Sequence, residues 1–539
     1  MEDRLKVEGR RLYGSYFSLQ SNFLNKRRMK MKTTRNLGVA VFVIASVMMG
    51  IVEPAVTYAE TPKMKMTTPI PDSITTPDKV QSSLGELTFV DGFPTEATIQ
   101  KSYDYLDTMR AVDVFLNSIP VASLVAMREG MKSVGVTGNT IGIFENLMDS
   151  KSLFLTPNSE SIYVGAWLDL SKGPLVVESP PNTLGIVDDM WFRYVADLGN
   201  AGPDQGRGGR FLFLPPGYDG PVPPMGFHVF QSKTFNNLLI WRGFLVDDSP
   251  KPGVESIKKH ARIYPLADIA NPPKQEFINL SGVAFNTIHA NDYSFFEEIN
   301  MAIQEEPVGS GDPELLGQLA GIGIQKGVEF APDARMKKIL TDAAAIGSAI
   351  ARAHIFDTRD KEAYIFKNSY WKTAFIGGNH LFTYEDGGRR LDARSMFFYY
   401  ATMITPAMAN KMVGVGSQYA LATVDSKGRL LDGAKNYKLT FPPDVPAKEF
   451  WSIVVYDNQT RSMLQTDQQF PSLNSERGVK INKDGTTDIY FGPKAPKGKE
   501  SNWIQTIPGK GWNTIIRLYG PLESWFDQTW KPGEIELVK

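Results

Sequence analysis

The stretch SIYVGAWLDLSKG, residues 161–173, has the β-branched and aromatic composition of a strand that runs into a turn. A second stretch, SQYALATVDSKG at residues 417–428, repeats its pattern. In both, a tyrosine precedes an aspartate by six residues, and Ser-Lys-Gly follows. The two stretches mark two strand-rich blocks of the chain that resemble each other.

Further matches between the blocks follow in the same order. Each block has a Pro-Pro pair, then a tryptophan six residues before an aspartate (Trp191 to Asp197, and Trp451 to Asp457), then an apolar strand that ends in Arg242 or Arg517. A spacing of six places both side chains on one face of a strand. The tryptophans would fill the core, whereas the aspartates would either face inward or end the strand in a turn. The repeat predicts a duplicated β-sandwich.

Segments whose apolar residues recur at helical spacing precede the first block and lie between the two blocks. The segment 95–135 is predicted to form two helices divided by Pro120. A single apolar stripe predicts a helix over 333–354, with Asp333 as its N-cap. The predicted fold class is therefore α+β, with two tandem antiparallel β-sandwich (jelly-roll-like) domains, N-terminal helices and inter-domain helices. The expected segments are a signal region (1–59), a loose leader (60–94), helices plus the first sandwich (95–253), a mostly helical connection (254–411) and the second sandwich (412–539).

The N-terminal region has the order of a secretory signal peptide. A basic cluster at 26–32 precedes an uncharged apolar run at 37–52, and Thr57-Tyr58-Ala59 offers small residues at a cleavage site. We expect a periplasmic or secreted bacterial protein cleaved near Ala59, with Met29 or Met31 as the true start and no membrane span after cleavage. A retained anchor is the alternative, although the run is shorter than the roughly 20 residues of a spanning helix.

Composition narrows the class of protein. The 539 residues include 58 basic and 59 acidic side chains and no cysteine. The balance of charge argues against a nucleic-acid-binding protein, and the absence of cysteine excludes disulfides, thiol catalysis and thiolate metal sites. No Gly-x-Ser-x-Gly elbow, phosphate loop or His-Glu-x-x-His motif occurs, and no nucleotide or flavin motif either.

Three motifs stand out in the two blocks: Thr156–Glu160, Gly209–Tyr218 and Leu431–Tyr437. With these motifs the chain resembles a bacterial family of two tandem domains of unknown function, numbered 1254 and 1214. The resemblance covers roughly 95–248 for the first domain and 412–530 for the second. It implies two jelly-roll-like sandwiches joined by helices, and it implies no settled activity and no catalytic residues.

Four residues are candidates for catalysis. His228, in a strand, and His380, in an aromatic loop, could complete a divalent metal site with a carboxylate, although a structural role explains both. Glu160, in a polar loop, and Asp188 could act as an acid–base pair. Salt bridging to the arginines of the same block is the alternative for the carboxylates.

Three residues are candidates for binding a substrate. Arg210 and Arg242 offer guanidinium groups that suit carboxylate, sulfate or phosphate ligands. Trp371 lies in a dense group of aromatic residues that could stack on a sugar ring, or could simply pack the helices against the sandwiches.

Two functions are consistent with these features. One is an exported hydrolase-like enzyme that acts on a small or oligomeric polar substrate, such as a glycan, at a cleft between sandwich and helices. The other is a non-catalytic ligand-binding or envelope-assembly protein, for which self-association into a homo-oligomer is expected by analogy with other jelly rolls.

Overall fold

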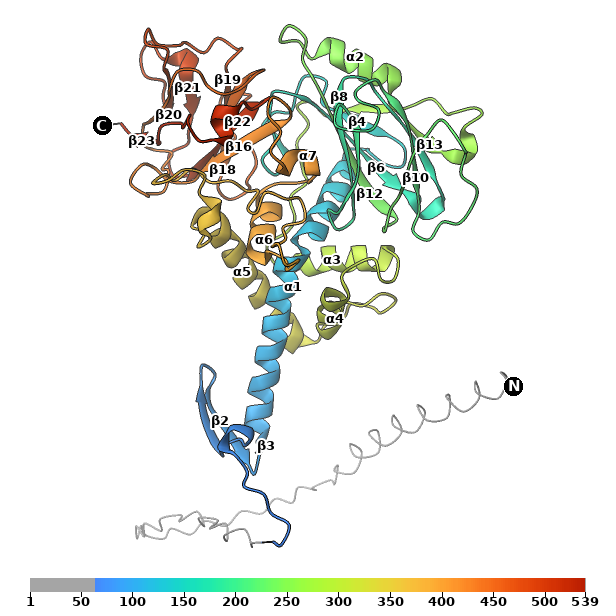
Figure 1. Ribbon diagram of the computed structural model, residues 1–539, viewed down its shortest axis with the longest axis vertical. Coiled ribbons are helices and arrows are strands. Elements are labelled where there is room, and N and C mark those ends of the chain that lie inside the picture. Colours follow the sequence, from blue (N-terminus) through green and yellow to red (C-terminus); the bar gives the residue numbers. More distant parts are fainter. Residues whose placement is uncertain (1–63, 539) are drawn as a thin grey trace, which may run out of the picture. The chain divides into compact units, whose positions relative to one another are not determined.

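The computed structural model describes residues 64–538, so the expected signal peptide and start site lie outside the described residues. The described chain is a mixed α+β structure whose sheets are mostly antiparallel (Figure 1). Residues expected to form a loose leader instead contain a three-stranded sheet of β1 (Lys79–Ser82), β2 (Gly85–Val90) and β3 (Phe93–Pro94).

Two sheets make up the first strand-rich unit. The larger has the order β14-β4-β6-β12-β8-β9, and the smaller β11-β10-β7-β13. Side chains that alternate along these strands fill a common apolar core, which includes Val164, Val177 and Phe213. The bounds are β4 (Ile141–Ile143), β6 (Ile162–Asp169), β7 (Leu175–Ser179), β8 (Thr183–Asp189), β9 (Tyr194–Gly199), β10 (Gly209–Leu214), β11 (His228–Gln231), β12 (Asn236–Gly243), β13 (Arg262–Pro265) and β14 (Phe277–Asn279).

Two four-stranded sheets make up the second unit, with the orders β16-β22-β18-β19 and β21-β20-β17-β23. They enclose a separate core that includes Ile453, Phe491 and Trp512. The bounds are β16 (Ser417–Ala422), β17 (Tyr437–Phe441), β18 (Trp451–Asp457), β19 (Ser472–Asn474), β20 (Thr487–Gly492), β21 (Trp503–Gln505), β22 (Trp512–Tyr519) and β23 (Glu536–Leu537).

The two units share one pattern of strand pairing. In each, three antiparallel pairs build one sheet (β6·β12, β12·β8 and β8·β9; β16·β22, β22·β18 and β18·β19). In the other sheet, one pair is parallel (β10·β11; β20·β21) and two are antiparallel. Strands β4 and β14 have no counterpart in the second unit.

The register corrects one predicted equivalence. Arg242 pairs with Leu184, and Arg517 pairs with Ser452, so the strand end Asp189 corresponds to Asp457. Trp191 follows β8 in a turn, whereas Trp451 begins β18, so these tryptophans are not equivalent. The matched spacing misled because a tryptophan in a turn and one in a strand can each precede an aspartate by six residues.

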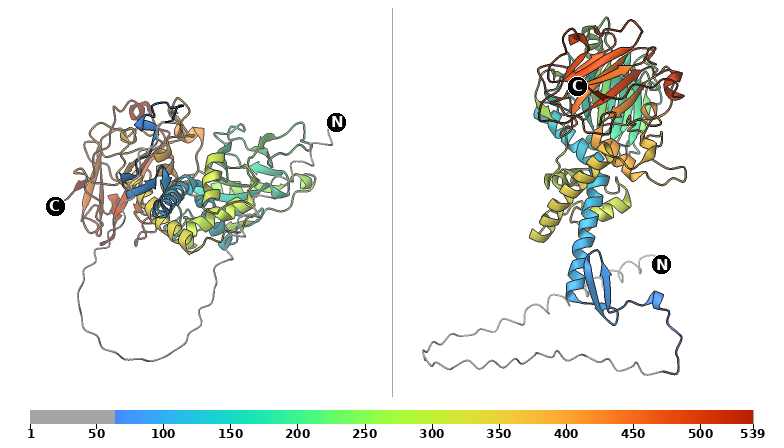
Figure 2. Two further views of the ribbon diagram at one scale, coloured as in Figure 1. Left: turned by 90° about the horizontal axis from the view of Figure 1, so that it is seen from below. Right: turned by 90° about the vertical axis from the view of Figure 1, so that its left-hand side faces the viewer.

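The helices form a third cluster between and beside the sheets. Helix α1 (Glu96–Ser133) packs against α3, α4, α5 and α6, which come from the segment expected to be helical (Figures 1 and 2). That segment also supplies β13 and β14 to the first unit, and its strand β15 (Phe285–Asn286) pairs with β5 (Ser152–Leu153) from the preceding segment. The remaining helices are α2 (Lys251–His260), α3 (Ser294–Glu305), α4 (Pro313–Gly321), α5 (Ala334–Phe356), α6 (Leu391–Tyr400), α7 (Pro406–Ala409) and α8 (Glu523–Phe526).

The structures of α5 and α1 can be compared with two predictions, the Asp333 cap and the division of a helix at Pro120. Asp333 caps α5, because its carboxylate accepts a hydrogen bond from the backbone N–H of Met336 at 2.7 Å. Pro120 does not divide α1, which continues through it. The proline is buried where α1 packs against neighbouring helices, and this packing offsets its local cost.

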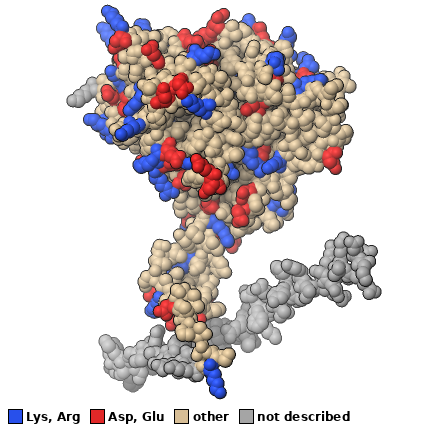
Figure 3. Space-filling view, in the orientation of Figure 1, with Lys and Arg blue, Asp and Glu red and all other residues tan. Residues whose placement is uncertain are grey.

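Both α1 and α5 are long and apolar enough to cross a membrane by length and composition alone. In α1, 67% of the most apolar window is buried inside the structure, as in the core helix of a globular protein. The molecular face shown in Figure 3 carries basic and acidic side chains side by side, without a broad area of one sign.

Candidate functional site

A mostly apolar pocket lies where the six-stranded sheet of the first unit, the β16-β22-β18-β19 sheet of the second unit and helix α6 meet. Its volume is about 100 Å³, which exceeds the ~10–15 Å³ that a single buried water occupies by the same measure. The apolar walls include Ile186 and Ile240 from the first unit, Leu421 and Ile515 from the second, and Phe397 from α6. Residues of both strand-rich units therefore build one cavity.

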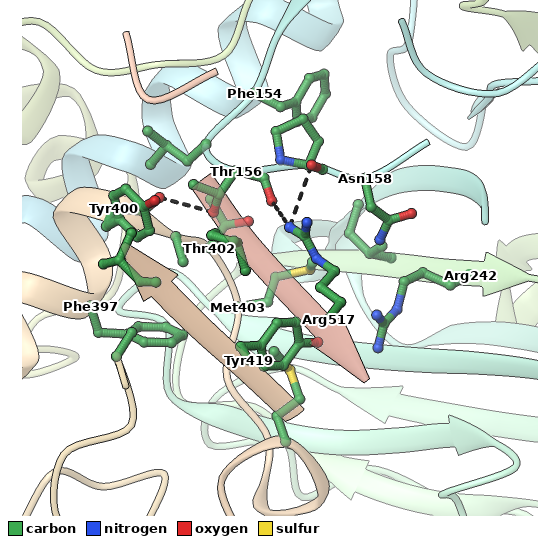
Figure 4. A pocket seen from close by; sticks show the side chains of 18 of the residues that line it. Phe154, Thr156, Asn158, Arg242, Phe397, Tyr400, Thr402, Met403, Tyr419 and Arg517 are labelled. Atoms are coloured by element: carbon green, nitrogen blue, oxygen red, sulfur yellow. Dashed lines mark hydrogen bonds between the residues drawn. The ribbon is translucent and has the colours of Figure 1, made fainter. Parts of the chain in front are cut away.

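Two arginines bring charge into this pocket from equivalent strand positions. Arg242 on β12 pairs across the strands with Tyr163 on β6, and Arg517 on β22 pairs with Tyr419 on β16. All four side chains line the pocket. In Figure 4, Arg242, Arg517 and Asn158 stand on one side of the view, and Phe397 and Tyr400 stand on the other. The pocket thus has a cationic end and an apolar end.

Arg517 also holds the loop that forms one wall. Its Nη2 donates to the carbonyl of Thr156 at 2.7 Å and to that of Pro157 at 3.4 Å (Figure 4). Tyr456 donates to the same Pro157 carbonyl at 2.5 Å. Thr156 has a positive φ of 41°, an uncommon conformation for a β-branched residue. The contacts between the units therefore hold this loop in a strained shape at the pocket.

The tyrosines keep the pocket's polar end neutral apart from the guanidinium groups. Burial raises the pKa of Tyr163, although Arg242 and Arg517 oppose the shift. Burial opposes ionisation of Arg242 as well, but Tyr419 and Tyr163 outweigh it and raise the pKa of this guanidinium. At neutral pH the arginine end of the pocket therefore presents the cations Arg242 and Arg517 beside the neutral phenol of Tyr163.

Neither guanidinium forms an ion pair with a carboxylate within residues 64–538. Arg517 donates only to backbone carbonyls, and its buried Nη1 has no hydrogen-bond partner. A buried donor without a partner costs about 1–3 kcal/mol. The third cation that lines the pocket, Lys372, is satisfied, because its Nζ donates to Ile355, Phe356 and Thr423. The donors without hydrogen-bond partners therefore belong to the guanidinium groups and not to Lys372.

The four predicted catalytic residues do not share one pocket. Glu160 is buried beside the pocket loop and accepts a hydrogen bond from Ser159 at 2.9 Å. Asp188 accepts from the backbone N–H of Ile404 at 3.0 Å. His228 lies on the smaller sheet with its ring 5.0 Å from Phe211, and His380 lies in a different cavity beside Tyr194. Among the described residues, no three histidine, aspartate or glutamate side chains gather in a possible metal-binding group.

The three predicted substrate-binding residues also lie in different parts of the structure. Arg242 lines the pocket. Arg210 is exposed on β10, where its guanidinium lies over Phe227 at 4.7 Å. Trp371 is fully buried in the core of the second unit, and its indole N–H donates to Gly533 at 2.8 Å. Trp371 is therefore a packing residue, as the alternative interpretation of the aromatic group held.

Sequence reasoning singled out Arg242 and noticed Tyr163, Tyr419 and Arg517 only as marks of the repeat. The strand register was the available signal, because a tyrosine and an arginine at matched positions in both blocks would face each other. The loop residues Thr156 and Met403 carried no comparable signal. They belong to irregular segments that only the packing of the two units brings together.

Comparison with known proteins agrees with the resemblance seen in the sequence. Residues 138–265 match the model of a protein family of unknown function, DUF1254, and residues 416–523 match another, DUF1214. The chain therefore carries these two domains in tandem. No curated protein matches it.

Two solved structures resemble the chain. The VPA0106 protein of Vibrio parahaemolyticus is 20% identical, with a TM-score of 0.47, over 80% of this chain and 100% of that one. An uncharacterised protein from Burkholderia cenocepacia is 12% identical, with a TM-score of 0.37, over 82% of this chain and 97% of that one.

Proposed function

We propose that the chain binds a small amphipathic anion, with a carboxylate or similar oxyanion on an apolar body, in the pocket between the two strand-rich units. The observation that carries this proposal is the pair Arg242 and Arg517, which face a mostly apolar cavity and form no ion pair with a carboxylate among the described residues. Guanidinium groups recognise carboxylates through two parallel hydrogen bonds. An apolar cavity with a few convergent polar groups is the usual form of a small-molecule site.

The charge balance supports an anionic ligand. Burying a cation without a counter-charge is costly, and a bound carboxylate would offset that cost at the same place. Tyr163 and Tyr419 would donate hydrogen bonds to the oxyanion, since both phenols line the pocket beside the arginines. The apolar body would lie against Phe397, Leu421 and Ile515.

A duplicated module would account for the symmetry of this site. The matching pairing patterns of the two units support an origin in one jelly-roll-like sandwich. The pairs Tyr163–Arg242 and Tyr419–Arg517 would then be copies of one strand feature. Each unit would supply one copy, and the ligand would lie at the contact between them.

A hydrolase-like activity is the second candidate, favoured by one observation. Asp188 and Asp197 lie on neighbouring strands and bind the segment after α6, which lines the pocket: Asp188 accepts from Ile404, and Asp197 accepts from Thr405 at 3.4 Å. Burial raises the pKa of Asp197 to about 6 and that of Asp188 well above its usual value. Carboxyl groups with raised pKa values serve as general acids. The signal-like N-terminus would place either activity outside the cytoplasm.

Calorimetric titration of the purified protein tests the binding proposal. We expect octanoate to bind and octanol, which has the same apolar body without the charge, to bind at least tenfold more weakly. Arg242→Gln should weaken octanoate binding at least tenfold, whereas the matched control Arg210→Gln, on the exposed face of β10, should not. Equal affinity for the acid and the alcohol, or an unchanged affinity in Arg242→Gln, would overturn the proposal.

A further inference from the structure

A second cavity lies on the other side of helix α6. Phe397 lines the first pocket, whereas its neighbours Arg394 and Phe398, one turn apart, line the second. The second cavity has a volume of about 440 Å³. Its walls come from the turn after β8, the start of α4 and the segment 380–391. The two cavities share no lining residue.

Three arginines from separate segments line this second cavity: Arg193, Arg389 and Arg394. Arg193 forms an ion pair with Asp189 at 2.6 Å. Arg394 donates only to the Asn117 carbonyl at 3.2 Å, and Arg389 to the Leu381 carbonyl. Burial, together with the neighbouring Arg389 and Arg193, lowers the pKa of Arg394 to about 10, although Asp312 opposes the shift. The positive charges are therefore close enough to repel one another.

Within residues 64–538, two buried donors in this cavity have no hydrogen-bond partner. The indole Nε1 of Trp191, a residue only 5% exposed, makes no hydrogen bond, and neither does the Nη2 of Arg193. Both residues line the cavity. A buried unsatisfied donor costs about 1–3 kcal/mol, and buried polar groups normally have a partner. Together they indicate an acceptor that the protein chain does not supply.

The nearby carboxylates do not supply it. Asp113 accepts hydrogen bonds from Asn117 at 3.0 Å and from Gln318 at 2.7 Å. Asp312 caps α4 by accepting from the backbone N–H of Glu314 at 3.0 Å. Glu314 itself is exposed. None of these three forms an ion pair with Arg389 or Arg394 within the described part of the chain, so the arginines keep their capacity to bind an anion.

We propose that this second cavity is a separate binding site for an oxyanion, the phosphate or carboxylate group of a small molecule. Arg394 and Arg389 would hold the oxygens, and the Trp191 indole would donate to the same group. Tyr194 and His380, whose rings meet edge to face at 5.9 Å, lie at this cavity and would contact the rest of the ligand. His380, which does not line the first pocket, would thus be a ligand-binding residue of this second cavity.

Titration with inorganic phosphate, which has no apolar body for the first pocket, tests the proposal and is monitored by calorimetry and by tryptophan fluorescence. We expect phosphate to bind saturably, with an affinity that falls as salt is raised. Arg394→Gln should weaken binding at least tenfold and Trp191→Phe severalfold, whereas Arg242→Gln, in the first pocket, should leave it unchanged. If Arg394→Gln does not fold, Arg389→Gln serves as the test instead, because Arg389 is exposed and its replacement should also weaken binding.

Two results would overturn this second site. One is the absence of saturable phosphate binding to the wild-type protein. The other is binding that Arg242→Gln removes and that Arg389→Gln and Trp191→Phe leave intact, since this would assign the anion to the first pocket. Loss of octanoate binding in Arg242→Gln with retained phosphate binding would instead support two independent sites.

Discussion

Tyr163 and Arg242 face each other across β6 and β12, and both side chains line the cavity between the two strand-rich units. Tyr419 and Arg517 repeat this relationship on β16 and β22. Two cations thereby meet in a mostly apolar setting, where the buried Glu160 acts on Arg517 but no carboxylate forms an ion pair with either arginine within the described residues. The proposed anion site follows from this arrangement, and its consequences can be tested separately.

Arg517→Gln should destabilise the protein more than Arg242→Gln does. Arg517 is 3% exposed and donates to the carbonyls of Thr156 and Pro157, so its loss leaves buried acceptors and frees the pocket loop. We expect a loss of about 2 kcal/mol in the free energy of unfolding, measured by urea denaturation. A smaller loss than that of Arg242→Gln would show that Arg517 does not hold the loop.

Asp197→Asn should stabilise the protein at neutral pH. Burial raises the pKa of Asp197 from 3.8 to about 6, so the folded state binds the proton more tightly than the unfolded state. The charged form therefore costs stability above pH 6, and the cost disappears as the pH falls below about 4. One pKa unit corresponds to about 1.4 kcal/mol, which makes about 3 kcal/mol the upper bound.

Thermal melts of wild type and Asp197→Asn across this pH range provide the measurement. The variant should melt several degrees higher at pH 7, and the two proteins should converge near pH 4. A difference between them that does not change with pH would contradict the assignment of the cost to the Asp197 charge.

Ala374→Phe should block the first pocket without unfolding the protein. Ala374 is a partly exposed residue of the pocket wall, and a phenyl ring there would occupy much of the ~100 Å³ cavity. We expect octanoate binding to fall below detection, while the melting temperature changes by only a few degrees. Ala374→Ser keeps the size of the side chain and should retain binding. If Ala374→Phe binds octanoate normally, the ligand lies elsewhere.

Gly130→Ala should weaken the packing of α1. A Cβ atom at Gly130 would lie 1.9 Å from the carbonyl oxygen of Asn286, so the helix or β15 must move. Overpacking of this kind costs about 1–3 kcal/mol. Gly317→Ala in α4 is the matched control, because no atom lies within 4 Å of the added Cβ. It should gain up to about 1 kcal/mol from helix propensity, and equal effects in the two variants would contradict the close contact.

Local patterns in the sequence predicted the regular elements well. The stretch 161–173 and the apolar stripe capped by Asp333 form β6 and α5 nearly as expected. Pro120 misled, because the local cost of a proline is offset by tertiary packing that the sequence does not display. The Trp191–Trp451 match misled because spacing alone cannot separate a turn from a strand.

The candidate site was less accessible to sequence reasoning. Arg242 stood out as an arginine at a strand end, but its partner across the units, Arg517, served only to mark the repeat. The first pocket depends on contacts between residues more than 200 positions apart, such as Asp188 with Ile404. Such contacts leave no periodicity in a single sequence. The predicted catalytic set failed to converge for the same reason.

The most direct test of the central claim is a crystal structure of the protein with 8-bromooctanoate, in which the anomalous signal of bromine locates the tail. We predict the carboxylate between Arg242 and Arg517, and the bromine at the apolar end near Phe397. Bromine density outside this pocket, or a carboxylate that contacts neither arginine, would contradict the account.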